Sequence, residues 1–176
     1  MRIALVVGIF ALVAGGSAFG ARSADQPCRG GALRGSFSLV PNSQGAGNVV
    51  YVLRLKNVST ATCTLTGLPQ VRLVDKLHKP LPTHATAAHP GQLTAILVRV
   101  APGGWASASA RFSPDVPGVG EGSTGPCERT AHAHALRVSA PGHGMALVPL
   151  RPPTPVCEHG GMSFSAYVQG QHPPNT

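Results

Sequence analysis

Acidic and aromatic side chains are scarce in this 176-residue chain. It has 6 acidic residues, and aromatic residues make up 5% of the sequence. Domains that bind single-stranded nucleic acid stack the bases on aromatic side chains that lie among basic ones. The basic residues here are scattered singly, and no aromatic residues interleave with them in that way. We therefore expect no nucleic-acid partner.

Long apolar runs are also missing, apart from one at the start of the chain. Residues 3–14 are almost wholly apolar, Arg2 precedes them, and small residues follow at positions 16–18 and 20. This is the pattern of a secretory signal peptide, and the run is shorter than the roughly 20 apolar residues that span a bilayer. The sequence predicts a signal peptide over residues 1–20, a secreted or cell-envelope location, and no transmembrane helix after cleavage.

Recognisable catalytic motifs are absent as well. The chain has no G-x-S-x-G, H-E-x-x-H or S-x-x-K motif, and its acidic residues are isolated from one another. Residues 120–125 match G-x-G-x-x-G, but Pro126 and Cys127 follow where a dinucleotide site needs a helix. We expect a loop there, no cofactor and no enzyme. A hydrolase whose site is assembled from distant residues remains an alternative.

The four cysteines are Cys28, Cys63, Cys127 and Cys157. Zinc knuckles use closely spaced cysteine pairs, whereas these are far apart, and an exported protein meets an oxidising environment. The sequence therefore predicts two disulfides. Four cysteines allow three connectivities, and their order along the chain favours Cys28 with Cys63 and Cys127 with Cys157.

The composition favours strands, because it has 22 glycines and 17 prolines and is poor in glutamate, aspartate and lysine. Residues 48–56 are the clearest strand, because apolar residues alternate there along one face. Further strands are expected at 33–40, 62–66, 71–75, 93–100, 105–112, 134–139, 145–148 and 162–168. Short strands at this spacing predict an all-β antiparallel sandwich of about 7–9 strands. The sandwich would occupy residues 28–169, after a linker at 21–27 and before a disordered tail at 170–176.

Two stretches rich in glycine or proline are expected to be loops, at residues 82–91 and 113–126. The expected core positions are apolar residues of the predicted strands: Tyr51, Leu53, Leu55, Leu73, Ile96, Val98, Val138, Phe164 and Tyr167. We also expect Trp105, the only tryptophan, to be a core residue. Asn57-Val58-Ser59 is a glycosylation sequon by pattern, but a strand-ending turn is the preferred interpretation.

The eight histidines raise the possibility of a metal site. His132 and His134 are two residues apart, so on a strand their side chains share a face and could chelate Cu²⁺ or Zn²⁺ with His143 or His159. No acidic residue flanks the pair to orient an imidazole ring. Exposed histidines without a metal are therefore the preferred interpretation, and a metal-binding protein using His132 and His134 is the alternative.

The sequence resembles a known family along most of its length. Residues 46–48, 55–57, 63–69 and 71–75, followed by 101–104, Cys127, 136–138 and 155–157, are similar to the secreted actinobacterial domain-of-unknown-function family 4232. The resemblance covers about residues 28 to 168, and the histidine- and proline-rich stretch at 78–89 departs from it. It implies an immunoglobulin-like sandwich in a secreted or envelope protein, and it transfers no catalytic residue.

The net charge is +8, or +7 once Arg2 is lost with the signal peptide. Such a charge can attract an anionic envelope polymer, but it can also reflect a mere scarcity of acidic residues, which the scattering favours. The sequence thus predicts a secreted or envelope-associated, non-catalytic binding or structural domain of unknown ligand. An anionic envelope polymer and another envelope protein are its candidate partners.

Overall fold

The computed structural model describes residues 26–45, 48–91, 96–114 and 132–173. The strands are β1 (Gln26–Pro27), β2 (Leu33–Leu39), β3 (Val49–Asn57), β4 (Cys63–Thr66), β5 (Gln70–Val74), β6 (His84–Ala87), β7 (Leu97–Val100), β8 (Trp105–Phe112), β9 (His132–Ser139), β10 (Met145–Pro155), β11 (Gly161–Phe164) and β12 (Val168–Gln169). Two short 3-10 helices, η1 (Gly30–Ala32) and η2 (Glu158–Gly160), complete the described elements. No helix in these ranges is long and apolar enough to cross a membrane.

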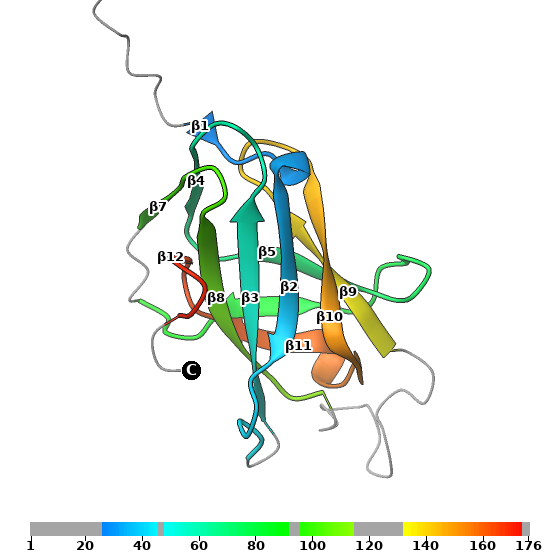
Figure 1. Cartoon of the computed structure of the whole chain (residues 1–176). Coiled ribbons are helices and arrows are strands. Elements are labelled where there is room, and N and C mark those ends of the chain that lie inside the picture. The colour runs from blue at the N-terminus through cyan, green and yellow to red at the C-terminus, as the bar shows by residue number, and fades with distance from the viewer. Residues whose placement is uncertain (1–25, 46–47, 92–95, 115–131, 174–176) are drawn as a thin grey trace, which may run out of the picture.

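The strands form two sheets. The larger sheet has the order β5-β9-β10-β2-β3-β8-β11-β6, with β12 also paired to β8, and the smaller has the order β1-β4-β7. In Figure 1, β10, β2, β3 and β8 form a front layer, and β9, β5, β6 and β11 cross behind it. The small sheet lies at one end. The all-β, sandwich-like fold expected from the sequence is confirmed.

The sheets are mixed rather than wholly antiparallel. The pairs β1–β4, β10–β2 and β11–β6 are parallel. Parallel neighbours need long connections, which leave no local turn pattern in a sequence. The structure also has more strands than the expected 7–9, and two of the strands, β1 and β12, have only two residues each. In addition, the stretch 82–91, expected to be a loop, contains β6, which pairs with β11.

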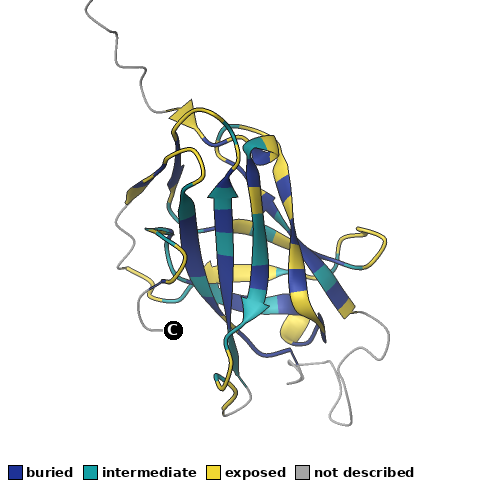
Figure 2. Cartoon of the chain, in the orientation of Figure 1, coloured by how far each residue is buried: buried dark blue, intermediate teal, exposed yellow. Residues whose placement is uncertain are grey.

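Strand β3 shows how the core forms. Tyr51, Leu53 and Leu55 point inward and are buried, whereas Arg54 and Lys56 are only partly covered. The aromatic residues stack inside, with ring centroids 4.9 Å apart for Phe37 and Tyr51. Figure 2 shows the resulting bands of buried and less buried residues along the front strands. The alternation predicted for this strand is confirmed.

The expected core residues are buried, with two exceptions. Ile96 is 49% exposed, because it lies just before Leu97, the first paired residue of β7. Trp105 is only half-buried, and the Lys56 Nζ atom lies 5.6 Å from the centre of its ring. It pairs with Lys56 across β3 and β8, so it belongs to the outer side of the sheet. The expectation of a core position was wrong for both residues.

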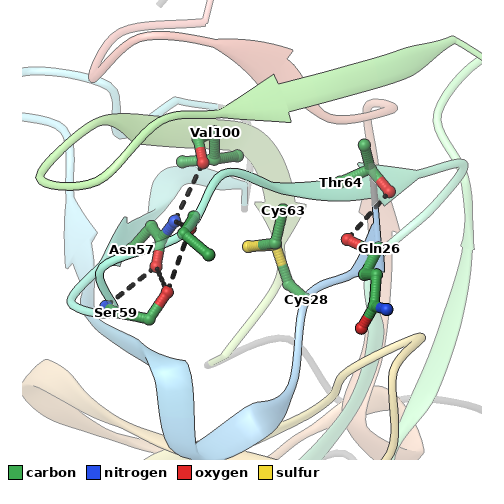
Figure 3. The surroundings of a disulfide bond; sticks show 8 residues. Gln26, Cys28, Asn57, Ser59, Cys63, Thr64 and Val100 are labelled. Carbon is green, nitrogen blue, oxygen red and sulfur yellow. Dashed lines mark hydrogen bonds between the residues drawn. A yellow bond between two sulfur atoms is a disulfide. The ribbon is translucent and has the colours of Figure 1, made fainter. Parts of the chain in front are cut away.

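One buried side chain connects the two sheets. The Asn57 Nδ2 group donates hydrogen bonds to the carbonyls of Ala61 (2.7 Å) and Val100 (2.9 Å). Its Oδ1 atom accepts from the backbone N–H (2.9 Å) and hydroxyl (2.7 Å) of Ser59 (Figure 3). Asn57 ends β3 of the large sheet, and Val100 ends β7 of the small one. The Asn57 side chain is fully buried. This agrees with its role in the strand-ending turn and not with a glycosylated asparagine, which must be exposed.

A disulfide joins Cys28 and Cys63 beside this corner, as their order along the chain favours (Figure 3). Cys63 also pairs with Val100, so the disulfide fixes the N-terminal segment to the same end of the small sheet. Cys157 is disulfide-bonded too. Cys127, the partner expected for it, lies outside the described residues.

The ends of the domain differ from the predicted boundaries. Strand β1 begins at Gln26, inside the predicted linker, and pairs with β4. Beyond residue 169, the tail expected to be disordered continues as a placed segment: the Gln171 carbonyl accepts a hydrogen bond from Arg54 Nε (2.9 Å), and Pro173 is buried. Together with the hydrogen bond from the Gly170 N–H to the Trp105 carbonyl (2.8 Å), these contacts hold the segment against the sheet. The predicted signal peptide and residues 21–25 are not among the described residues.

We expect Asn57→Ala to lower the free energy of unfolding by about 2–4 kcal/mol, because it leaves the buried carbonyl of Val100 and the partly buried carbonyl of Ala61 without their donor. Urea unfolding followed by circular dichroism measures this. Ser59→Ala, which removes one hydroxyl from the same turn, should cost about 1 kcal/mol. Equal losses in the two variants would contradict the central role of Asn57.

Both tyrosines should resist ionisation in the folded protein. Burial raises the pKa of Tyr167, and burial raises the pKa of Tyr51 against the opposing effect of a hydrogen bond with Thr154. When folding raises the pKa of a tyrosine, the free energy of unfolding is unaffected below the unfolded-state pKa of about 10. It falls as the pH rises above that value, because the unfolded chain ionises first. Absorbance at 295 nm should therefore show tyrosinate appearing only together with alkaline unfolding. A midpoint near pH 10 with unchanged circular dichroism would contradict this.

Candidate functional site

The histidines proposed as metal ligands do not form a cluster in the described residues. His132, at the start of β9, is exposed, and His134 is half-buried, with the fully buried Ala133 between them. His143 lies in the turn between β9 and β10, beyond the far end of β9, and His159 lies in η2. Within the described ranges, no group of three or more histidine, cysteine or acidic side chains could hold a metal ion. The glycine-rich stretch 120–125 lies outside those ranges.

The basic residues, in contrast, come together on the sheet. Arg72 of β5 pairs with Arg137 of β9, and Arg137 pairs with Leu147 of β10. Further along the same sheet, Arg34 of β2 pairs with Lys56 of β3, and Lys56 pairs with Trp105 of β8. Residues that pair across neighbouring strands point to the same face of a sheet. Each of these two groups therefore forms a continuous line of side chains.

The pairing of β10 with β2 joins the two lines. Leu150 lies beside Phe37 in this parallel pair, and the Gly30 N–H donates to the His143 carbonyl (3.0 Å). The two residue numbers differ by the same offset in both pairs. This offset places Leu147 beside Arg34. The six residues thus form one row across six strands, and the row bends with the sheet where β9 and β5 pass behind the front layer (Figure 1). We call it the basic row: Arg72, Arg137, Leu147, Arg34, Lys56 and Trp105.

Further basic residues share the outer face of the large sheet. Arg54 follows the buried Leu53, Arg111 lies between the buried Ala110 and Phe112, and Arg151 follows the buried Leu150. Because strand side chains alternate between faces, all three point outward. We call this surface the basic face, and its seven basic residues are Arg34, Arg54, Lys56, Arg72, Arg111, Arg137 and Arg151.

Acidic residues do not balance this charge within the described strands, since none of the twelve contains aspartate or glutamate. Of the acidic residues in the described ranges, Asp75 lies in the turn after β5 and Glu158 lies in η2. The Asp75 Oδ1 atom accepts hydrogen bonds from the backbone N–H groups of Leu77 and Lys79, both at 2.8 Å. The carboxylate of Asp75 therefore has a structural role in its turn.

Neutral carbonyls hold several of the guanidinium groups in place. Arg34 donates to the carbonyls of Gly31 (3.2 Å) and Leu33 (2.9 Å), and Arg137 donates to the carbonyl of His78 (2.6 Å). Arg54 is held by the Gln171 carbonyl, as described above. A carbonyl acceptor orients a guanidinium without cancelling its charge, so the basic face remains strongly positive.

A pocket of about 420 Å³ opens at one end of the basic row. It lies among β5, β9 and the start of β10, and it is lined by Gln70, Val71, Arg72, Pro80, Arg137, Ser139 and Met145. The two arginines that pair across β5 and β9 are both in its wall. A second pocket, of about 250 Å³, lies between β5 and β6 and includes His84.

Sequence reasoning missed the basic face because its residues are far apart in the chain. A local signal does exist, since most of them alternate with buried apolar residues, as in Val71-Arg72-Leu73 and Leu136-Arg137-Val138. That alternation predicts an outward side chain within each strand. The assembly into one row depends on the pairing between distant strands, which the alternation does not specify.

The fold and this surface together define a disulfide-clipped, all-β sandwich domain with a strongly basic outer sheet face. A family model described as a domain of unknown function, DUF4232, matches residues 28–167. The chain therefore belongs to this family, in agreement with the resemblance found in the sequence. Neither a curated protein nor a solved structure matches the chain.

The basic face should lower the stability of the fold. Arg72 and Arg137 lie directly opposite each other, and like charges in this position destabilise a sheet. We expect Arg72→Gln to raise the free energy of unfolding by about 0.5 kcal/mol at low salt, and the gain to fade as salt screens the repulsion. Urea unfolding at 10 mM and 500 mM NaCl (about 30 Å and 4 Å Debye length) measures this.

Lys76→Gln, in the exposed turn after β5, is the matched control and should change stability less. The expectation is wrong if Arg72→Gln destabilises the protein equally at both salt concentrations.

Proposed function

We propose that this protein is a non-catalytic binding domain of the secreted or cell-envelope space that binds an anionic polymer through its basic face. The observation that carries the proposal is the basic row, in which four cations lie across the sheet, two on each side of Leu147. Cations arranged in this way attract an anionic chain over long distances, and each contact with the chain releases a bound counterion.

The dimensions of the basic row favour a polymer over a single small ion. Neighbouring strands are about 4.8 Å apart, so a row across six strands is about 24 Å long when it is followed along the curved sheet. Only an extended ligand can contact Arg72 at one end and Lys56 near the other. The exposed Leu147 between Arg137 and Arg34 interrupts the charge but offers an apolar contact to the carbon skeleton of such a ligand.

Two features support the proposed location. The start of the sequence has the charge and apolar pattern of an export signal. The disulfide between Cys28 and Cys63 is of a kind that persists in oxidising compartments and is rare in the cytosol. A domain exposed to the outside of the cell would meet anionic polymers of the envelope directly.

Binding to immobilised polyphosphate tests the proposal. Arg34→Gln/Lys56→Gln removes two cations of the basic row, and we expect the slope of log affinity against log salt to fall in magnitude by about 1.5. Fluorescence of Trp105, the only tryptophan, reports binding in solution because its ring contacts Lys56. We expect the emission to change when polyphosphate is added.

The matched control is Lys76→Gln/Lys79→Gln, which loses the same charge from the exposed turn after β5. It should keep most of the affinity. Equal loss in the two double variants would show that net charge alone drives binding, and the proposed role of the basic face would then be wrong.

A further inference from the structure

We propose that the pocket among β5, β9 and β10 is a site for one phosphomonoester group that the bound polymer carries. The guanidinium groups of Arg72 and Arg137 would bind the phosphate oxygens, and Met145 would contact the esterified carbon atoms. This inference deepens the proposed function and rests on it, because it names the chemical class of the anion.

The strand register brings the polar groups of the pocket together. Arg72 pairs with Arg137, and two residues further along the strands Gln70 pairs with Ser139. Side chains two residues apart share a face, so both pairs line the same side of β5 and β9. Paired residues have Cα atoms about 4.5–5.5 Å apart. Two guanidinium groups, an amide and a hydroxyl therefore converge within two successive rows of the sheet.

This set of donors suits phosphate better than carboxylate. A guanidinium presents a planar fork of N–H groups that matches two oxygens of an anion. A carboxylate has only two oxygens, which one arginine can occupy, whereas a phosphomonoester has three terminal oxygens and can also bind a second arginine and hydroxyl or amide donors. The Arg137 side chain is already held by the His78 carbonyl, so little of its freedom would be lost on binding.

A bound anion would also remove the repulsion between the two arginines. They face each other across neighbouring strands, and no described strand contributes an acidic residue between them. Like charges placed directly opposite are unfavourable in a sheet. An anion between them replaces this repulsion with two favourable contacts.

The apolar side of the pocket indicates an ester rather than a free phosphate ion. Met145, in the wall of the pocket, pairs with Ser139 and is 58% exposed. Leu147, which is not part of the wall, pairs with Arg137 and is 43% exposed. The pocket volume of about 420 Å³ is within the range of small-molecule sites and is much larger than one phosphate needs. The carbon atoms next to the phosphate would cover these two side chains.

The ester belongs to a polymer rather than to a lipid headgroup on two grounds. The pocket continues into the basic row, which offers Arg34 and Lys56 to the next anionic groups of a chain. The exposed apolar side chains near it are Met145 and Leu147 on β10 and Leu77 in the turn after β5, which belong to separate elements. A membrane-binding surface would be expected to present a broader apolar area to insert.

Isothermal titration at constant ionic strength tests the site with three probes: inorganic phosphate, butyl phosphate and butyrate. We expect butyl phosphate to bind most tightly and butyrate most weakly. Arg72→Gln and Arg72→Lys should both weaken butyl phosphate binding at least tenfold, since lysine keeps the charge but lacks the fork. Met145→Ser should reduce the preference for butyl phosphate over inorganic phosphate to less than twofold.

Lys76→Gln is the control, because it removes a cation that lies outside both the pocket and the basic face and should leave butyl phosphate binding unchanged. The proposal is overturned if butyrate binds as tightly as butyl phosphate, or if Lys76→Gln weakens binding as much as Arg72→Gln does. Sedimentation with phosphatidylglycerol vesicles examines the source of the phosphate. Vesicle binding that is lost in Arg72→Gln would assign the site to a lipid headgroup and overturn the polymer.

Failure of the site and failure of the proposed function have different outcomes. If polyphosphate retention depends on Arg34 and Lys56 while butyl phosphate shows no dependence on Arg72, the phosphate site is wrong and the binding face stands. If retention falls equally in the Lys76/Lys79 control, the binding face itself is wrong.

Discussion

The buried amide of Asn57 is the interaction on which the rest of the structure depends. Its hydrogen bonds fix the end of β3 in the large sheet to the end of β7 in the small one. The Asn57 backbone also bonds to Gly103 and Gly104 before β8, and the Cys28–Cys63 disulfide lies at the same corner. With this end fixed, β3 cannot shift along its neighbours. A shift of one residue would turn Arg54 and Lys56 into the core and Leu53 and Leu55 outward.

The same alternation thus produces both the core and the basic face. Each strand places apolar side chains inward, where the stacked Phe37 and Tyr51 and the buried leucines stabilise the sandwich. The outward positions then carry cations from six different strands without an acidic residue on any described strand. Mixed charges would make a more stable surface. A surface that carries only cations is expected to bind an anionic ligand, because the ligand offsets the repulsion between the basic side chains.

Local features of this protein could be predicted from the sequence, and pairings between distant strands could not. The alternation in residues 48–56 predicts β3 and its buried face, and chain order favours the Cys28–Cys63 pair. The core position expected for Ile96 is wrong because the alternation in the sequence begins before Leu97, where the pairing of β7 starts. The basic row and its pocket depend on which strand lies beside which and in what register. Those are set by packing across the whole domain, so single arginines in the sequence look unrelated.

Glycine at position 30 explains how the two halves of the basic row become continuous. The pair Arg72 and Arg137 reaches Arg34 and Lys56 only through the parallel contact of β10 with β2. At the start of that contact Gly30 packs directly on the backbone of Met145, and a Cβ atom there would overlap the Met145 nitrogen. Any larger residue would push β10 away from β2 near the place where Leu147 lies beside Arg34. The close approach that glycine allows therefore holds both the parallel pair and the continuity of the charged surface. The same contact also positions Met145, so the pocket at the end of the row depends on it too.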